Sequence, residues 1–194
     1  GEFLGWPVET PPPAQGKPWF ARPAPLQGER SALVIGGGLA GCATAASLAA
    51  RGWNVKLLER HGALAQEASG NPQGVLYLKL SAHGTALSQL ILSGFGHTRR
   101  LLEHLHRGVD WDGCGVLQLA FNAKEAERQA QLAEAFAPGL LHPLDTAQAQ
   151  ARAGVALAHG GLFYPEGGWV HPPALCEWQA RHPLIEVLPH HEAL

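Results

Sequence analysis

The chain has 194 residues and a formal net charge of −2, with 14 Lys and Arg residues against 16 Asp and Glu residues. This length allows one domain with a hydrophobic core, or a domain plus a tail. The charge argues against a protein that binds nucleic acid or a membrane surface through bulk charge. No apolar run approaches the ~20 residues that span a bilayer, and the N-terminus lacks the pattern of a signal peptide, so we expect no membrane partner.

The cysteines and histidines do not form a recognisable metal or disulfide pattern. Cys42, Cys114 and Cys176 are widely spaced, and none belongs to a C-x-x-C. This spacing predicts neither a disulfide framework nor a zinc site and suits a reducing cytosol, so we expect a cytoplasmic protein. His104 and His106 are two residues apart on a predicted helix and would point to different faces, so we predict no metal site. The chain has no methionine and begins with Gly-Glu-Phe, which we interpret as an excised piece of a longer protein.

The first elements form a β-α-β unit behind a proline-rich segment. Residues 1–30 carry seven prolines and are predicted to be an extended linker. An apolar strand over 32–35 is followed by an alanine-rich helix over 39–51, which Gly52 ends. A second strand covers 55–58. The order strand, helix, strand predicts a parallel sheet with its crossover helix.

The remaining elements are predicted from apolar periodicity, capping residues and turn residues. They are a helix over 81–107 with Ser81 as N-cap, which Gly94 and Gly96 can interrupt; a strand over 115–121; a surface helix over 123–136; a short helix from the cap Asp145 to Gly154; a strand over 161–164 followed by a PEGG turn; a helix from Pro172-Pro173 to about Arg181; and a strand over 185–188.

A dinucleotide-binding fingerprint follows the first strand. Gly36-x-Gly38-x-x-Gly41 lies between strand and helix, and Glu59 ends the second strand 23 residues after Gly36. The first glycine allows a tight turn, the second lets a pyrophosphate approach the backbone, and the third allows close helix–strand packing. The helix N-terminus favours an anion, and the carboxylate can accept hydrogen bonds from both ribose hydroxyls, which argues against NADP. We predict an adenine dinucleotide site; a glycine-rich turn without a ligand is the alternative.

The loop after the second strand bears on the choice between FAD and NAD. The stretch ASGNPQG (68–74) has small residues that let the backbone run close to a ligand. A simple NAD-binding fold usually continues into another helix and strand at this point. We interpret the loop as a second contact with the cofactor, over its pyrophosphate and ribityl region. An ordinary surface loop explains its composition equally well.

Several stretches together resemble one protein family. Their combination is similar to the oxidoreductase domain of the bifunctional tRNA-modifying MnmC family, within the D-amino-acid oxidase superfamily of flavoproteins. The resemblance runs from about Lys17 to Val187. The stretches are the linker KPWFARP, the fingerprint with Glu59, ASGNPQG followed by LY, WDGCGVLQL and YPEGGWVHP.

The resemblance implies an α/β fold and a domain layout. We expect a Rossmann-like FAD-binding domain, whose parallel sheet contains the β-α-β unit, with part of an α+β substrate domain, truncated at the C-terminus. The expected layout is an interdomain linker over 1–30, the FAD-binding part over 31–80, a partial substrate domain over 81–170, and a return to the FAD-binding domain over 171–194.

The resemblance also implies an activity. FAD would take a hydride from the glycine-like carbon of a carboxymethylaminomethyl group on the wobble uridine of tRNA. The imine then hydrolyses to glyoxylate and an aminomethyl uridine. A methyltransferase domain that uses S-adenosylmethionine, expected in the parent chain, then methylates the amine. The flavin carries the difficult chemistry, and the protein mainly positions the carbon.

Candidate site residues follow from the same match, without any assigned catalytic residue. The residues expected to contact FAD are Gly36, Gly38, Leu39, Ala40, Gly41, Glu59, Arg60, Ser69, Gly70, Asn71 and Gly74. The residues expected near the flavin ring or the substrate are Tyr77, Lys79, His83, Tyr164 and Trp169. Tyr77 and Trp169 are aromatics of a kind that more often belongs to the core than to a ligand site.

Two other functions stay open at this point. One is a small-molecule amine or amino-acid oxidase of the same superfamily, similar to glycine or sarcosine oxidase. The other is a non-catalytic piece that binds a nucleotide. Because only three strands are predicted for the parallel sheet, we expect exposed apolar surface, weak FAD binding and no oxidase activity for this chain alone.

Overall fold

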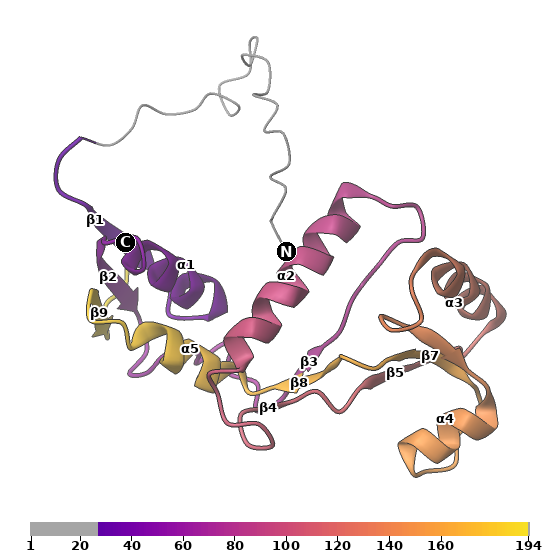
Figure 1. Cartoon of the computed structure of the whole chain (residues 1–194). Helices are drawn as coiled ribbons and strands as arrows, with labels where there is room; N and C mark the ends of the chain where they lie inside the picture. Colours follow the sequence, from indigo (N-terminus) through magenta and orange to yellow (C-terminus); the bar gives the residue numbers. More distant parts are fainter. Residues whose placement is uncertain (1–26, 194) are drawn as a thin grey trace, which may run out of the picture. The chain divides into compact units, whose positions relative to one another are not determined.

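The computed structural model describes residues 27–193. The predicted linker over 1–30 lies almost entirely outside the described residues and stays a prediction. Ser31–Leu194 forms one compact unit, which is coloured along the sequence in Figure 1. The described part of the chain contains no helix long and apolar enough to cross a membrane.

The compact unit alternates helices and short strands. The strands are β1 (Ser31–Ile35), β2 (Asn54–Glu59), β3 (Gly74–Leu76), β4 (Trp111–Asp112), β5 (Val116–Leu119), β6 (His142–Leu144), β7 (Gly161–Tyr164), β8 (Gly168–Val170) and β9 (Ile185–Pro189). The helices are α1 (Leu39–Ala49), α2 (Ala86–Leu102), α3 (Ala123–Ala135), α4 (Thr146–Ala153) and α5 (Pro172–Ala180).

A three-stranded parallel sheet carries the predicted β-α-β unit. Its order is β1-β2-β9, so the last strand of the chain lies beside β2 and the residues between them form an insertion. Parallel neighbours need a crossover connection, and α1 and α5 provide the crossovers. Both helices have buried cysteines that pack with Leu57, because small side chains let a helix approach a sheet closely. This α/β arrangement confirms the predicted fold class.

One edge of this sheet is open in the described part of the chain. There β1 pairs only with β2, and its Leu33 and Ile35 are 59% and 64% exposed. Parallel sheets ordinarily bury both faces. The expected exposed apolar surface is therefore present on β1.

Two antiparallel sheets form the rest of the unit. Their orders are β3-β8-β4 and β5-β7-β6, so the consecutive strands β7 and β8 are the central strands of the two sheets. A buried cluster joins these sheets to the helices, with Phe95 from α2 and Leu132 from α3 packed against Leu162 and Tyr164 of β7. The antiparallel region is therefore held by its own core, distinct from the cluster under α1.

Several predicted boundaries in this region were wrong. The helix over 81–107 begins only after its N-cap Thr85, whose side chain accepts the backbone N–H of Ser88. Ser81 instead lies before the helix and donates its N–H to the Ser88 hydroxyl, 3.1 Å away. The two glycines of α2 do not interrupt it, since the helix runs without a break to Leu102. His104 and His106 therefore follow the helix rather than belonging to it.

Other predictions were confirmed, and some short strands were missed. Asp145 caps α4 through a capping box with Gln148, and Gly154 ends the helix in the left-handed conformation. The strand predicted over 115–121 is shorter in the structure, where β5 runs only from Val116 to Leu119. The strands β3, β4, β6 and β8 were not predicted, because each has only two or three residues.

Candidate functional site

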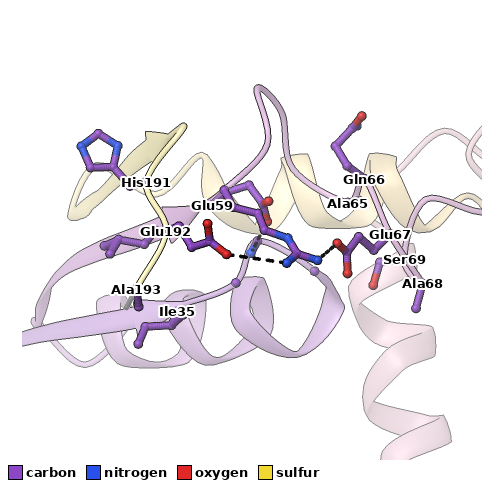
Figure 2. Close-up of a pocket in the computed structure, with 15 residues that line it drawn as sticks. Ile35, Glu59, Ala65, Gln66, Glu67, Ala68, Ser69, His191, Glu192 and Ala193 are labelled. Carbon is purple, nitrogen blue, oxygen red and sulfur yellow. Dashed lines mark hydrogen bonds and ion pairs between the residues drawn. The ribbon is translucent and has the colours of Figure 1, made fainter.

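A cavity of about 440 Å³ opens where the strands of the parallel sheet end. Figure 2 shows residues from β1, β2, the following loop and the end of the chain around it. Ligands of open α/β sheets bind outside the carboxyl ends of the strands, so this is the expected position. The lining residues are Ile35, Gly36, Gly37, Gly38, Leu58, Glu59, Arg60, Ala65, Gln66, Glu67, Ala68, Ser69, His191, Glu192 and Ala193.

The glycine loop is shaped by close approach of the backbone. Gly36 has φ +96°, and its N–H donates to the carbonyl of Leu58, 2.8 Å away. A Cβ at Gly41 would overlap the carbonyl oxygen of Gly36, so α1 can start this close to the loop only with glycine there. A Cβ at Gly38 would lie 3.0 Å from the hydroxyl oxygen of Ser69. The loop therefore presents backbone rather than side chains to the cavity.

Glu59 lies beneath this loop and is 7% exposed. One carboxylate oxygen accepts the N–H of Gly37 at 2.7 Å, and the other accepts the N–H of His61 at 2.8 Å. Burial raises the pKa of the Glu59 carboxyl, but these two backbone hydrogen bonds, with the nearby charges of His61 and Arg60, outweigh it. The net pKa of Glu59 is below its usual value, so the carboxylate is ionised at neutral pH and keeps further acceptor sites.

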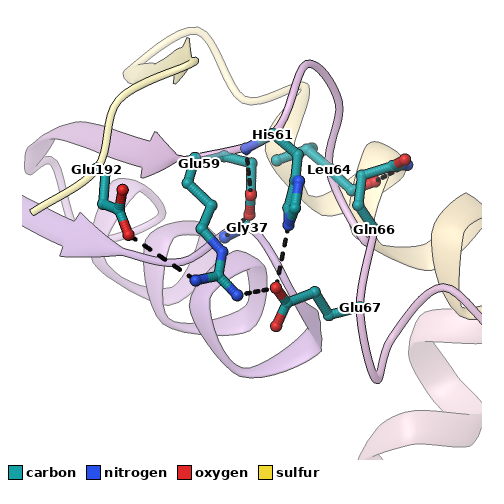
Figure 3. A network of polar contacts seen from close by, with 8 residues as sticks. Gly37, Glu59, His61, Leu64, Gln66, Glu67 and Glu192 are labelled. Atoms are coloured by element: carbon teal, nitrogen blue, oxygen red, sulfur yellow. Dashed lines mark hydrogen bonds and ion pairs between the residues drawn. The ribbon is translucent and has the colours of Figure 1, made fainter.

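Charged side chains bridge the outer rim of the cavity. The Arg60 guanidinium pairs with Glu67 of the following loop and, at 3.8 Å, with Glu192 after β9. Figure 3 labels the two glutamates of these pairs. His61 Nε2 lies 3.0 Å from the same Glu67 oxygen. All four side chains are more than two-fifths exposed, so their ion pairs contribute little to stability. These ion pairs instead hold three segments together across the opening: the end of β2, the loop after it and the residues after β9.

The loop after β2 contacts the glycine loop directly. Ala65 donates its N–H to the carbonyl of Gly37 at 3.0 Å, and Ser69 Oγ accepts the N–H of Leu39 at 3.0 Å. The first N–H of α1 is thus occupied by a hydroxyl whose own proton can still be donated. A Cβ at Gly70 would lie 2.7 Å from the carbonyl oxygen of Ala65, which shows how tightly this loop turns.

The remaining residues predicted near FAD lie beyond the cavity lining. Asn71 donates its side-chain amide to the carbonyl of Ala68 and stabilises the turn. Gly74 begins β3, opposite Val170 of β8. Ala40 is exposed in the first turn of α1.

The predicted substrate residues belong to or border the antiparallel region. Tyr77 and Lys79 follow the end of β3, are exposed and alternate with the buried Leu78 and Leu80. Val75 of β3 pairs with Trp169 of β8, whose indole is half-buried.

The other two predicted substrate residues are Tyr164 and His83. Tyr164 is 2% exposed and belongs to the core of the antiparallel region. Burial raises the pKa of its phenol, against the opposing effect of Arg128, and Tyr77 lies close enough to raise this pKa further. His83 is exposed in the turn before α2.

Sequence analysis missed several residues of the cavity. One of them is Gly37, where a Cβ would lie 2.9 Å from a Glu59 carboxylate oxygen and 2.5 Å from the Leu64 side chain. His191 and Glu192 come from the end of the chain. The sequence could have indicated His191 and Glu192, because a parallel strand over 185–188 beside β2 places the residues that follow it at the same edge of the sheet.

Comparison with protein families agrees with this geometry. Residues 31–184 match the family model described as FAD dependent oxidoreductase. The chain belongs to the FAD dependent oxidoreductase family. The cofactor of this family is FAD, which confirms the prediction of FAD over NAD.

Two curated relatives with high sequence identity to this chain share the same protein name. The chain is 79% identical over all 194 residues to the tRNA 5-methylaminomethyl-2-thiouridine biosynthesis bifunctional protein MnmC of Pseudomonas fluorescens. It is 72% identical over 187 residues to the protein of that name from Pseudomonas aeruginosa. The chain spans 29% of the length of each of these relatives. The predicted resemblance to the MnmC family is confirmed.

Solved structures show the same fold at low identity. Glycine oxidase from Bacillus cereus superposes with a TM-score of 0.65 at 22% identity, over 84% of this chain and 46% of that one. Fructosamine oxidase from Aspergillus fumigatus superposes with a TM-score of 0.66 at 19% identity, over 85% of this chain and 41% of that one.

The residues at the cavity fit the adenosine and pyrophosphate half of FAD. The cavity is lined by the backbone of Gly36, Gly37 and Gly38 at the start of α1, and an ionised acid lies directly beneath this loop. The hydroxyl of Ser69, which accepts the first N–H of α1, is the polar side chain nearest to the position of the pyrophosphate. The cavity chemistry and the family membership therefore agree.

Proposed function

We propose that this chain is the FAD-binding segment, with part of the substrate domain, of a bifunctional enzyme that modifies the wobble uridine of tRNA. The observation that carries this proposal is 79% identity to a MnmC protein across the whole chain. Such identity extends far beyond the fingerprint, which many nucleotide-binding families share. The fold alone also fits oxidases of small amines, but the likeness to those is near 20% identity.

Within this proposal, Glu59 accepts hydrogen bonds from the ribose hydroxyls of FAD. Its two carboxylate oxygens already accept the N–H groups of Gly37 and His61, which fixes their orientation before the cofactor arrives. The backbone at Gly38 and the hydroxyl of Ser69 lie where the pyrophosphate reaches α1. Arg60 and Glu67 connect the edges of the opening over the adenosine.

The proposed reaction is removal of a carboxymethyl group from 5-carboxymethylaminomethyl(-2-thio)uridine. The methylene carbon between nitrogen and carboxylate would lose a hydride, for which bound FAD would be the acceptor. Loss of the nitrogen proton leaves a carbon–nitrogen double bond, water adds to its carbon, and the bond to nitrogen breaks. The products are glyoxylate and 5-aminomethyl(-2-thio)uridine. Within this proposal, the exposed cation Lys79 attracts the substrate carboxylate.

The proposed partners are tRNA and a methyltransferase domain of the same polypeptide that uses S-adenosylmethionine. Both come from the likeness to the bifunctional relatives, of which this chain spans 29%. We place this activity in the cytoplasm, where a reducing environment suits the free cysteines of the described chain.

The proposal is tested with the full-length protein, purified with FAD. It should release glyoxylate from tRNA that carries the carboxymethylaminomethyl group, and mass spectrometry of the digested tRNA should show the aminomethyl uridine. Unmodified tRNA is the matched control. Turnover of free glycine or sarcosine, with the modified tRNA left unchanged, would instead identify a small-molecule oxidase.

A further inference from the structure

The Cys42 thiol contacts the glycine loop from the side of the hydrophobic core. Cys42 stands near the start of α1, is fully buried, and belongs to the core cluster under this helix rather than to the lining of the cavity. Its Sγ lies 3.4 Å from the carbonyl oxygen of Gly37, to which the thiol donates. A core residue therefore makes a polar contact with the loop that faces the cofactor.

Cys42 holds two successive carbonyl groups of this loop. Its backbone N–H donates to the carbonyl of Gly38 at 2.9 Å, and its thiol donates to the carbonyl of Gly37. The Gly37 carbonyl also accepts the N–H of Ala65 at 3.0 Å. Ala65 belongs to the loop after β2, whereas Cys42 belongs to a helix packed in the core, so the thiol ties this carbonyl to α1.

The direction of the Gly37 carbonyl decides the direction of the next N–H group. A trans peptide unit is planar, so the carbonyl of Gly37 and the N–H of Gly38 point to opposite sides. With the carbonyl held toward the core by Cys42, the N–H of Gly38 points away from the core, and Gly38 lines the cavity. This N–H is therefore presented to the position proposed for the pyrophosphate.

The peptide unit needs a partner because it lies between two glycines. Glycine populates positive and negative φ about equally, so the unit that joins Gly37 to Gly38 can rotate at little cost. Glu59 accepts the N–H of Gly37, which fixes the preceding unit and leaves this one to the partners of its carbonyl. A rotated unit would turn an oxygen toward the pyrophosphate in place of a donor.

A second thiol provides a matched position for comparison. Cys176 of α5 is also fully buried, belongs to the same core cluster and is hydrogen-bonded to the Cys42 thiol. The carbonyl of Gly37 can only accept, so the Cys42 proton is directed to it and the bond between the thiols uses the Cys176 proton. Loss of the Cys176 thiol would therefore empty the same part of the core and leave the bond from Cys42 to Gly37 in place.

We propose that Cys42 is a positioning residue for the cofactor, whose thiol aims the N–H of Gly38 at the pyrophosphate. The proposal rests on the role proposed for this cavity and deepens it. A thiol is a weak hydrogen-bond donor, so its effect on affinity is modest and limited to ligands that carry the pyrophosphate. Binding of the adenosine half, for which Glu59 is the proposed acceptor, does not depend on it.

The test uses full-length apoprotein and two ligands. ADP-ribose carries the pyrophosphate and is titrated by calorimetry, whereas adenosine has the ribose without any phosphate and is titrated by NMR. Cys42→Ala and Cys42→Val both remove the donor, and valine also fills the space of the thiol. Cys42→Ser keeps a donor, and Cys176→Ala is the packing control. Urea denaturation measures the stability of each variant.

The two variants without a donor at position 42 should bind ADP-ribose roughly two- to fivefold more weakly and adenosine as the wild type does. Cys42→Ser should restore most of the affinity, and Cys176→Ala should keep wild-type affinity even if it lowers stability as much as Cys42→Ala does. Wild-type ADP-ribose affinity in Cys42→Ala and Cys42→Val would overturn the proposal, and so would equal weakening by Cys176→Ala or of adenosine binding. Glyoxylate release from modified tRNA is measured separately on the wild type, and its absence would reject the proposed function while leaving this role of Cys42 intact.

Discussion

In two glycine-rich stretches of this chain, glycine is required because another backbone segment lies too close for a Cβ. The surroundings of the two stretches differ. In 36–41, a Cβ at Gly41 would overlap the backbone of Gly36. In 160–168, a Cβ at Gly161 would overlap the carbonyl of Gln118 on the neighbouring strand β5. Both stretches bring two backbone segments together, but only the first leaves a cavity with an ionised acid beneath it.

The comparison shows that close backbone approach does not by itself identify a ligand site. Around β7 the space that the glycines leave is filled by the neighbouring strands and by a core that contains Tyr164. Around Gly37 it is filled by the carboxylate of Glu59 and by open volume at the sheet edge. The acid at the end of β2, rather than the glycines, separates the two cases.

The largest effects are expected from adding a methyl group at the closest contacts. Gly41→Ala and Gly161→Ala should each lower the free energy of unfolding by at least about 2 kcal/mol, because the added Cβ meets backbone that has to shift. Urea denaturation of the full-length protein measures this loss. Of the two variants, only Gly41→Ala should also weaken FAD binding in the molecules that remain folded. Equal weakening by Gly161→Ala would mean that the two stretches do not differ as described.

Gly38→Val should remove the cofactor with little loss of fold. The branched side chain would occupy the pyrophosphate position, whereas its nearest protein neighbour is the movable side chain of Ser69. We expect the variant to purify without the flavin absorbance bands and with a circular dichroism spectrum close to that of the wild type. A yellow variant with normal FAD content would show that the pyrophosphate does not pass this glycine.

A smaller effect on FAD binding is expected when one glutamate from each of the two regions is replaced by glutamine. Glu59→Gln should weaken FAD binding by about 1–3 kcal/mol, because one acceptor facing the ribose becomes a donor. Glu125→Gln is the matched change in α3, where the carboxylate pairs with Arg128 at 2.6 Å, and it should leave FAD affinity unchanged. Calorimetric titration of FAD into both apo-variants makes the comparison.

The same two acids make a prediction about pH. The pKa of Glu125 is lowered by its hydrogen bond to Arg128, and that of Glu59 is lowered because backbone hydrogen bonds outweigh burial. A lowered pKa in the folded state adds stability above the ordinary glutamate pKa of about 4.3, and this stability is lost as pH falls through the lowered value. The difference in unfolding free energy between wild type and either Gln variant should therefore be largest near neutral pH and shrink on acidification. A difference that grows on acidification would contradict the direction of both shifts.

The smallest effect on stability should come from replacing a glycine whose position has space for a Cβ. Gly94 lies inside α2, and a Cβ there meets nothing within 4 Å. Gly94→Ala should therefore raise the unfolding free energy by about 0.5–1 kcal/mol through helix propensity and leave FAD binding unchanged. A loss of stability would indicate that this surface of α2 contacts another part of the full-length protein.

The parallel region was largely predictable from the sequence, whereas the antiparallel region was predictable only for its helices and its two longer strands, β5 and β7. The β-α-β unit, the acid after β2 and the three strands of the sheet follow from apolar runs and glycine spacing, which are local signals. The strands β6 and β8 have three residues each and exist through pairing with distant segments, so no local pattern marks them. Pro143 lies in β6 and is tolerated there because β6 is an edge strand of its sheet.

The site was predictable to a similar degree. Glycine spacing indicates the loop, but not that Gly37 donates to Glu59 or that Ser69 reaches the start of α1, because these contacts depend on how loops fold back. Tyr164 illustrates the opposite difficulty. The family motif suggested a place near the substrate, while in the structure all four residues of β7 are buried and the side chain of Tyr164 belongs to the core.

The most direct test of the account is whether Glu59 acts on the adenosine half of FAD. Full-length apoprotein would be titrated with FAD and with ADP-ribose, which lacks the flavin ring, in the wild type and in Glu59→Gln. We predict that the two ligands compete for one site and that the substitution weakens both by the same factor, since the contact is to their shared ribose. An ADP-ribose affinity that is unchanged in Glu59→Gln would contradict the assignment of this cavity to the cofactor.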